Sequence, residues 1–369
     1  MRAKDREERG LQAASVGRPA AGAPGTPTPV AIPEEPAGIA ATELEGTYEA
    51  GVELKARSQW AYARMRFLRH RLAVVSLVIL VLIALVAVFA DQIAPYGYDE
   101  IPFTDPENLI ENPNLIAETL NQKPTFRDWH IFGTDQLGRD YFSRVIYGIR
   151  TSLWVALVVG VLSTAIGTFL GAVAGYYGGG IDNLLMRFTD LVLTLPGLAV
   201  LLTAAQFIGQ GDAELNLGIW KPTLPQPLVI GLILAFLLWT TIARIVRGLF
   251  LSLREKEYVE AAKAAGASDA RIMARHMLPN AVGPIVVNAT LVVAAAILIE
   301  ATLSFIGFGI QPPNAAIGKL IADGQQQGIQ TWWLVTFPGL VIVVVALCIN
   351  FVGDGLRDAL DPTQRRIRA

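Results

Sequence analysis

Apolar residues along this chain gather into runs that alternate with polar segments. The first run extends from Leu72 to Ala90 and contains one polar residue, Ser76. A helix needs about 20 predominantly apolar residues to cross a bilayer. Later runs of similar length predict further spans, at about 151–175, 188–208, 227–242, 281–299 and 334–352. The pattern therefore predicts an all-α integral membrane protein with six transmembrane helices.

The composition agrees with a membrane protein. Hydrophobic residues make up 53% of the 369 residues and charged residues only 17%, whereas a soluble domain has about 25% charged residues. The single cysteine, Cys348, lies within an apolar run, so an intrachain disulfide is excluded. The three histidines are far apart in sequence, so no Cys/His pattern indicates a metal site.

Charge on the two sides of the first span predicts its orientation. Basic and aromatic residues are interleaved over residues 55–71, directly before the span, and acidic residues dominate the segment after it. Because cytoplasmic loops carry an excess of Lys and Arg, the N-terminus is predicted in the cytoplasm. A basic-aromatic segment can also bind nucleic acid, but directly before a span it is more typical of the membrane interface. Six spans then place both termini in the cytoplasm, together with the basic loop at 254–280.

Residues 254–280 form a polar segment between two apolar runs, and we call this segment the elbow. Its first half, 257–265, is rich in Ala, Glu and Lys and predicts a short helix. Gly266 follows where a helix end favours a residue that adopts positive φ. Ser268 is suited to cap a second short helix, which Pro279 is expected to end. DNA-binding helix-turn-helix motifs also join two helices at a Gly, but they are not normally placed between membrane spans.

Small and aromatic residues predict local packing. Gly167, Gly171 and Gly175 are spaced four apart, which lets helices approach closely in lipid and is a better interpretation than a pore lining. The Gly-rich stretch 175–187 predicts a tight turn. The Trp pair at 332–333 is placed like an interfacial aromatic belt.

The sequence contains no recognised catalytic motif. Nucleophile-elbow, zinc-protease and Walker A patterns are missing, so neither hydrolysis nor nucleotide binding is predicted on this chain. A secondary transporter that binds its substrate with intramembrane charges is a second class to weigh, and a polytopic enzyme is a third. Asp190, Glu300 and Arg187 are the candidate charges, and all lie near predicted span ends, where a charge can reach water at modest cost. Asp190 and Glu300 are predicted either to line a translocation path or to have a structural role.

The elbow resembles a known motif. Glu260-Ala261-Ala262, followed by Gly266 and then Leu278-Pro279, is similar to the EAA loop of ABC importer permeases. His276 stands where an Ile is usual, but the sequence RHMLPN at 275–280 is similar to the peptide-permease branch. Further stretches resemble oligopeptide and dipeptide permeases, at 132–153, 175–187 and 300–313.

This resemblance implies a type I ABC importer permease fold, closest to the oligopeptide, dipeptide and nickel permease family and to its second permease component. In that family the elbow docks on a cytoplasmic ATPase subunit as a coupling helix. The residues implied in ATPase coupling are Glu257, Glu260, Ala261, Ala262, Gly266, Ala267, Arg271, Leu278 and Pro279. Glu260 would make a polar contact, Ala261 would allow close approach, and Gly266 would allow the bend between the two helices.

The resemblance also implies the partners and the location. The complex would contain a second homologous permease, two ATPase subunits and an extracytoplasmic substrate-binding protein, in the lipid bilayer of the bacterial cytoplasmic (inner) membrane. No nucleic-acid partner is expected. ATP and magnesium would bind the ATPase subunits, so neither a cofactor nor enzyme activity is expected on this chain. The expected cargo is peptides or similar small solutes.

The same reasoning predicts the organisation of the chain. Its segments are a disordered cytoplasmic tail at 1–54, an interfacial segment with the first span at 55–96, an extracytoplasmic loop and lead-in at 97–146, a five-helix permease core at 147–356 and a cytoplasmic tail at 357–369.

Overall fold

The computed structural model describes residues 59–101, 119–126, 130–208, 213–214 and 223–360. The predicted N-terminal tail at 1–54 lies outside the described residues. So do residues 361–369 of the predicted C-terminal tail and much of the acidic loop that follows the first span.

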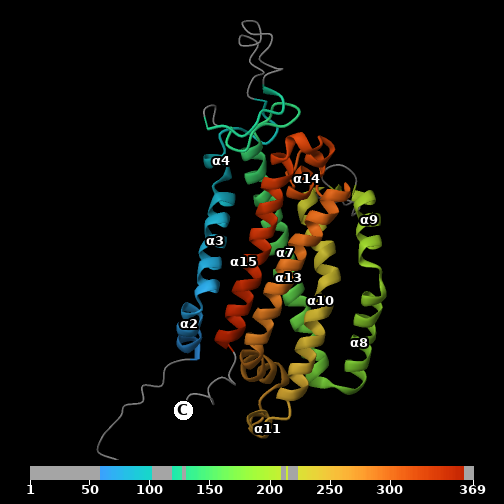
Figure 1. Ribbon diagram of the computed structural model, residues 1–369. Coiled ribbons are helices and arrows are strands. Elements are labelled where there is room, and N and C mark those ends of the chain that lie inside the picture. The colour runs from blue at the N-terminus through green and yellow to red at the C-terminus, as the bar shows by residue number, and fades with distance from the viewer. Residues whose placement is uncertain (1–58, 102–118, 127–129, 209–212, 215–222, 361–369) are drawn as a thin grey trace, which may run out of the picture. The chain divides into compact units, whose positions relative to one another are not determined.

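Long helices dominate the described part of the chain (Figure 1). The longest are α3 (Arg71–Val88), α7 (Tyr141–Tyr177), α10 (Gln226–Leu253), α13 (Leu278–Ile306) and α15 (Trp333–Leu360). The shorter helices are α2 (Gln59–Arg69), α4 (Ala90–Ile93), α8 (Gly179–Thr194), α9 (Gly197–Ile208), α11 (Glu257–Ala264), α12 (Asp269–Arg271), the π-helix η1 (Ile272–Met277), α14 (Ile317–Gln326) and the 3-10 helix η2 (Ile329–Thr331). Two short strands, β1 (Ala213–Glu214) and β2 (Thr223–Leu224), pair antiparallel before α10.

The long helices run side by side and leave two distinct ends (Figure 1). At one end lie α2, the start of α8 and the elbow with α11, and we call it the elbow end. At the other lie α4 and α14, and we call it the α14 end. By the charge rule, the elbow end is the predicted cytoplasmic side.

Within the described residues, five helices are long and apolar enough to cross a membrane, and the bent pair α8 and α9 would make a sixth span. Five of the six predicted spans are therefore confirmed as single helices by length and composition, and the third differs from its prediction as one helix over 188–208. It is broken after Thr194, and the two parts are bent by 72°. Pro196 explains the break, because proline lacks an N–H and pushes the preceding residue out of the α region. Leu195 accordingly has extended backbone angles, with φ −67° and ψ 129°.

Most other spans extend beyond their apolar runs. The second begins at Tyr141 rather than at about 151, and the fourth continues to Leu253 rather than ending at about 242. The predicted turn at 175–187 is limited to Gly178 and Gly179, because α8 begins at once. The additional helical turns carry polar residues, such as Arg144 and Arg247, that form ion pairs in the fold. A prediction based on apolar runs ends the span before these residues because they are polar.

Of the two tryptophans in the predicted aromatic belt, only Trp332 is exposed. Trp332 is about half exposed, but Trp333 is buried and its Nε1 lies 3.5 Å from the carbonyl oxygen of Thr134. Trp333 therefore packs the lead-in of α7 against the start of α15 and is not available to the interface.

A glycine seam, formed by Gly167, Gly171 and Gly175, joins α7 to α10. A Cβ atom added at Gly167 would lie 2.6 Å from the carbonyl oxygen of Trp239, and one added at Gly175 would lie 2.6 Å from that of Arg247. Gly171 is equally crowded by the α10 backbone. The prediction that this stripe serves close helix packing is confirmed, since only hydrogen side chains allow the two backbones to approach this closely.

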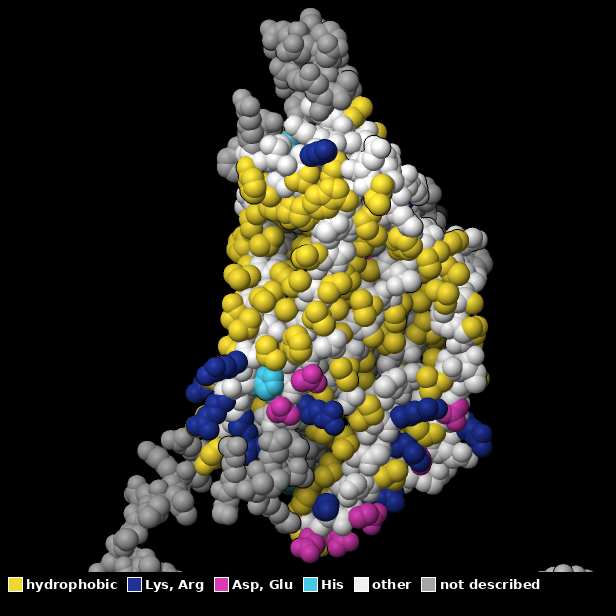
Figure 2. All heavy atoms as spheres, viewed as in Figure 1, with side chains coloured by type: hydrophobic (Ala, Val, Ile, Leu, Met, Phe, Trp, Pro, Cys, Tyr) yellow, Lys and Arg dark blue, Asp and Glu magenta, His cyan; other side chains and the backbone are white. Residues whose placement is uncertain are grey.

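Apolar side chains cover the flank between the two ends (Figure 2). The exposed apolar side chains of the long helices and of α8 include Phe169, which is 68% exposed, and Leu184, which is 71% exposed. Charged side chains gather instead toward the elbow end in this view. This distribution of side chains fits a helix bundle embedded in lipid, because apolar side chains that face lipid are not exposed to water.

We expect Gly167→Val to destabilise the protein by about 1–3 kcal/mol or more, because overpacking would force α7 and α10 apart. Gly248→Val on α10 is the matched control, since a Cβ there meets nothing within 4 Å. Thermal unfolding of the purified protein in detergent measures both. Equal melting temperatures for the two variants would contradict the role of the seam.

Candidate functional site

The first elbow helix, α11, has one buried anchor and an exposed polar face. Val259 is fully buried in the main apolar core, and Ala262 packs partly buried against the same core. Glu257, Glu260 and Ala261 are exposed. Helix α11 is therefore fixed from beneath while its outer face is open to a partner.

The joint after α11 is a Schellman motif centred on Gly266. Its φ is +78°, the left-handed conformation predicted for this position. The Gly266 N–H donates to the carbonyl of Lys263, and the Ala267 N–H donates to that of Ala262. These two bonds satisfy carbonyls that the helix end would leave unpaired and turn the chain sharply.

The second elbow helix does not end at Pro279, so that expectation was wrong. α12, η1 and α13 form one continuous run from Asp269 to Ile306. Pro279 lies inside this run, two residues after η1, so its missing N–H removes one hydrogen bond without ending the helix. Ser268 stands at the N-cap position as predicted, but its side chain makes no capping bond.

The outer surface of the elbow holds the predicted ATPase-coupling residues. Six of them are exposed and three are partly buried: exposed are Glu257, Glu260, Ala261, Gly266, Arg271 and Pro279, and partly buried are Ala262, Ala267 and Leu278. Ile272 and Met277 alternate with them and are fully buried beneath. The assignment of the nine exposed and partly buried residues to ATPase coupling stays a prediction.

Asp190, one of the three candidate charges near the span ends, is paired. Its Oδ1 accepts a hydrogen bond from Arg244 of α10 at 2.6 Å, and both side chains are about half exposed. About two turns nearer the start of α8, Asp182 forms a bidentate ion pair with Arg247. The two pairs attach α8 to α10, and the sequence did not indicate which Asp pairs with which Arg.

Glu300 is fully buried within α13, so the expectation that its charge reaches water was wrong. Ser152 of α7 donates a hydrogen bond to Oε2 at 2.7 Å, and Ser304 donates one to Oε1 at 2.8 Å. The Ile310 N–H donates in turn to the Ser304 hydroxyl at 3.1 Å. Glu300 therefore connects α7, α13 and the segment after α13. Among the described residues it forms no ion pair.

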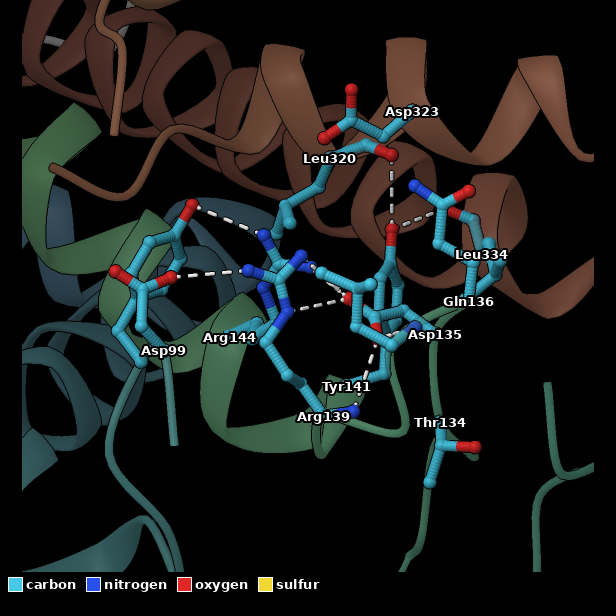
Figure 3. Close-up of polar contacts among 12 residues, drawn as sticks. Asp99, Thr134, Asp135, Gln136, Arg139, Tyr141, Arg144, Leu320, Asp323 and Leu334 are labelled. Atoms are coloured by element: carbon cyan, nitrogen blue, oxygen red, sulfur yellow. Dashed lines mark hydrogen bonds and ion pairs between the residues drawn. The ribbon is translucent and has the colours of Figure 1, made fainter. Parts of the chain in front are cut away.

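A charged network that the sequence reasoning missed lies at the α14 end (Figure 3). Arg139 and Arg144 both converge on Asp135, and Arg139 also bonds Asp99 at 3.1 Å. Beside them the Tyr141 hydroxyl lies 3.0 Å from the carbonyl of Leu320 and 2.6 Å from that of Leu334.

This network holds the lead-in of α7 to α14 and α15. The only sequence signal for it was the alternation of Asp and Arg over 135–144, which does not identify the partners.

Metal ligands are not gathered anywhere in the described part of the chain, where no group of three His, Cys, Asp or Glu side chains could hold an ion.

Two family models match the sequence. Residues 167–366 match the binding-protein-dependent transport system inner membrane component, and residues 58–124 match the N-terminal TM domain of oligopeptide transport permease C.

Similar proteins carry related names. A putative peptide transport system permease protein of Brucella abortus is 40% identical over 297 residues, covering 80% of this chain and 90% of that protein. The oligopeptide transport system permease protein OppC of Escherichia coli is 37% identical over 324 residues, covering 88% of this chain and 98% of that protein. A solved structure of the MetNI methionine ABC transporter, in inward facing conformations, matches 60% of this chain and 97% of its own at 20% identity, with a TM-score of 0.46.

The apolar spans and the exposed elbow are those of a membrane transport subunit. The chain belongs to the family of binding-protein-dependent transport system inner membrane components, and is a multi-pass permease subunit of the bacterial inner membrane. The resemblance noted in the elbow is thereby confirmed at the level of the family.

We expect Glu300→Ala to lower stability by about 2–4 kcal/mol, because it leaves a cavity and two buried hydroxyls without their acceptor. Glu300→Gln keeps the shape and a carbonyl acceptor, so it should cost less than about 1.5 kcal/mol. Thermal unfolding in detergent separates the two. A Gln variant as unstable as the Ala variant would show that the negative charge itself is needed.

Asp135→Ala should cost about 3–5 kcal/mol, because two largely buried guanidinium groups lose their shared carboxylate. The comparison is Asp91→Ala, which breaks the half-exposed pair with Arg150 and should cost about 1 kcal/mol or less. The melting temperatures of both variants test the difference, and similar values would argue against a structural role for the network.

Proposed function

We propose that this chain is a permease subunit of an ATP-driven importer that takes up peptides delivered by an extracytoplasmic binding protein. Its complex would contain a second homologous permease and two ATPase subunits. The family membership and the names of the similar proteins support this proposal. ATP and magnesium would bind the ATPase subunits, so the part of this chain is mechanical.

The elbow is the observation that carries the proposal. A partner can move a membrane helix only through a surface that is exposed to the partner and rigidly supported from beneath. α11 meets both conditions, since Glu257 and Glu260 are exposed while Val259 is fully buried. The elbow also joins two spans directly, because α10 enters it and α13 leaves it. Displacing it would therefore tilt both helices.

The secondary-transporter alternative has less support. It requires an intramembrane charge that is available to a substrate or ion. Asp190 is paired with Arg244, and Glu300 is enclosed by two serine hydroxyls. Both candidates are thus engaged in helix packing in this structure.

Glu260→Lys tests the function most directly. We expect the ATPase subunits to be lost when the tagged chain is purified in gentle detergent from its native membrane, and ATP-driven peptide uptake by vesicles to fall about tenfold or more, the effect of about 1.4 kcal/mol.

Asp354→Lys is the matched control. It makes the same charge change at an exposed residue of α15, outside the elbow. Retention of the ATPases by both variants would contradict docking through Glu260. If the wild-type chain purified alone and transported without ATP, the importer proposal would be wrong. Uptake of a labelled nickel chelate in place of a labelled peptide would reject the peptide cargo.

A further inference from the structure

The elbow is connected to the rest of the described chain by the backbone at both ends and by a side chain from a third helix. Residues 254–256 link it to α10, and η1 continues into α13. The third connection comes from Tyr176, at the last turn of α7, which touches both halves of the elbow.

Tyr176 binds the two elbow helices with different parts of one side chain. Its hydroxyl donates a hydrogen bond to Oδ1 of Asp269, the first residue of α12, at 2.6 Å. The Lys263 ammonium of α11 lies 5.4 Å from the centre of its ring. Hydrogen bonds to carboxylates and cation–π contacts are both stronger than neutral contacts. The Tyr176 side chain is largely buried, whereas Asp269 and Lys263 are exposed.

The connection to α7 is also a connection to α10. Gly175, next to Tyr176, is in such close contact with α10 that an added Cβ would lie 2.6 Å from the Phe250 Cβ atom. Sliding of α7 along α10 would bring the closely packed backbones of the glycine seam into clash, and separating the two helices would lose that packing. A displacement of the elbow that reaches Tyr176 therefore moves α7 and α10 together.

The elbow is connected to α13 by a continuous backbone that contains an irregular helical segment. Residues 272–277 are a π-helix, and Pro279 follows within one turn. A π-helical turn and a proline are two recognised causes of helix bending, because both interrupt the regular i→i+4 hydrogen bonds. Bending between the elbow and α13 would therefore be concentrated at η1.

We propose that Tyr176 is a positioning residue that clamps the elbow to α7, so that the elbow and the α7–α10 pair move as one body while α13 bends at η1. This inference rests on the proposed function, since it assigns the path by which ATPase movement reaches the spans. We call the contact of Tyr176 with Asp269 and Lys263 the tyrosine clamp.

Tyr176→Phe is the first test, because it removes only the hydroxyl and keeps the ring beneath Lys263. Tyr177→Phe is the matched control on the adjacent, half-exposed tyrosine, for which the structure gives a ring contact with Tyr176. The experiment uses the complete complex in proteoliposomes and measures peptide taken up per ATP hydrolysed. We expect this ratio to fall about tenfold for Tyr176→Phe, as for the loss of one hydrogen bond to a charged group, and to stay unchanged for Tyr177→Phe.

Two further readouts separate clamping from a general loss of structure. The ATPase subunits should co-purify with Tyr176→Phe at wild-type amounts, and ATP hydrolysis should continue. Asp269→Ala should lower the ratio similarly, and the double variant should be no worse than either single one, because all three lack the same bond. Additive losses, or a Tyr176→Phe variant equal to Tyr177→Phe, would overturn the clamp. If the wild-type complex showed no ATP-driven peptide uptake, the proposed function would fail first, and the clamp with it.

Discussion

The close approach of α7 and α10 is the constraint on which the rest of the structure depends. Three glycines remove the side chains that would otherwise separate the two backbones. Lipid gives helices no hydrophobic reason to associate, so close van der Waals contact of this kind supplies much of their attraction. From this pair of helices, Arg247 of α10 forms an ion pair with Asp182 of α8, and Ser152 of α7 donates a hydrogen bond to Glu300 of α13.

The sequence predicted the existence of the spans better than their limits. Apolar runs are sufficient to find a membrane helix, because the bilayer requires them. The ends are set by partners that the sequence does not identify, as for Tyr141, whose hydroxyl reaches the carbonyl oxygens of Leu320 and Leu334. Local chemistry was reliable at Gly266, where one residue decides the backbone, whereas the break before Pro196 was not predicted. It failed at Pro279, because the run from Asp269 to Ile306 accommodates the proline just after a π-helical segment instead of ending there.

The candidate site shows the same division. The elbow could be located from its polarity and its resemblance to a known loop, and its exposed face follows from the helical period. The buried polar contacts could not be predicted. Ser152 and Glu300 are 148 residues apart, and Tyr176 and Asp269 are 93 apart. Such pairs become visible only when the helices are placed, although a buried carboxylate within a span was a sound reason to examine Glu300.

α7 has a consequence for communication across the membrane. Its 37 residues contain no proline and rise about 55 Å, compared with a hydrocarbon core of about 30 Å. It begins in the arginine–aspartate network beneath α14 and ends at the side chain that grips the elbow. One uninterrupted rod thus has a charged anchor on each side of the bilayer. A displacement of α7 at one end of the bundle would therefore reach the other end through one continuous backbone, without a relay of intermediate side chains.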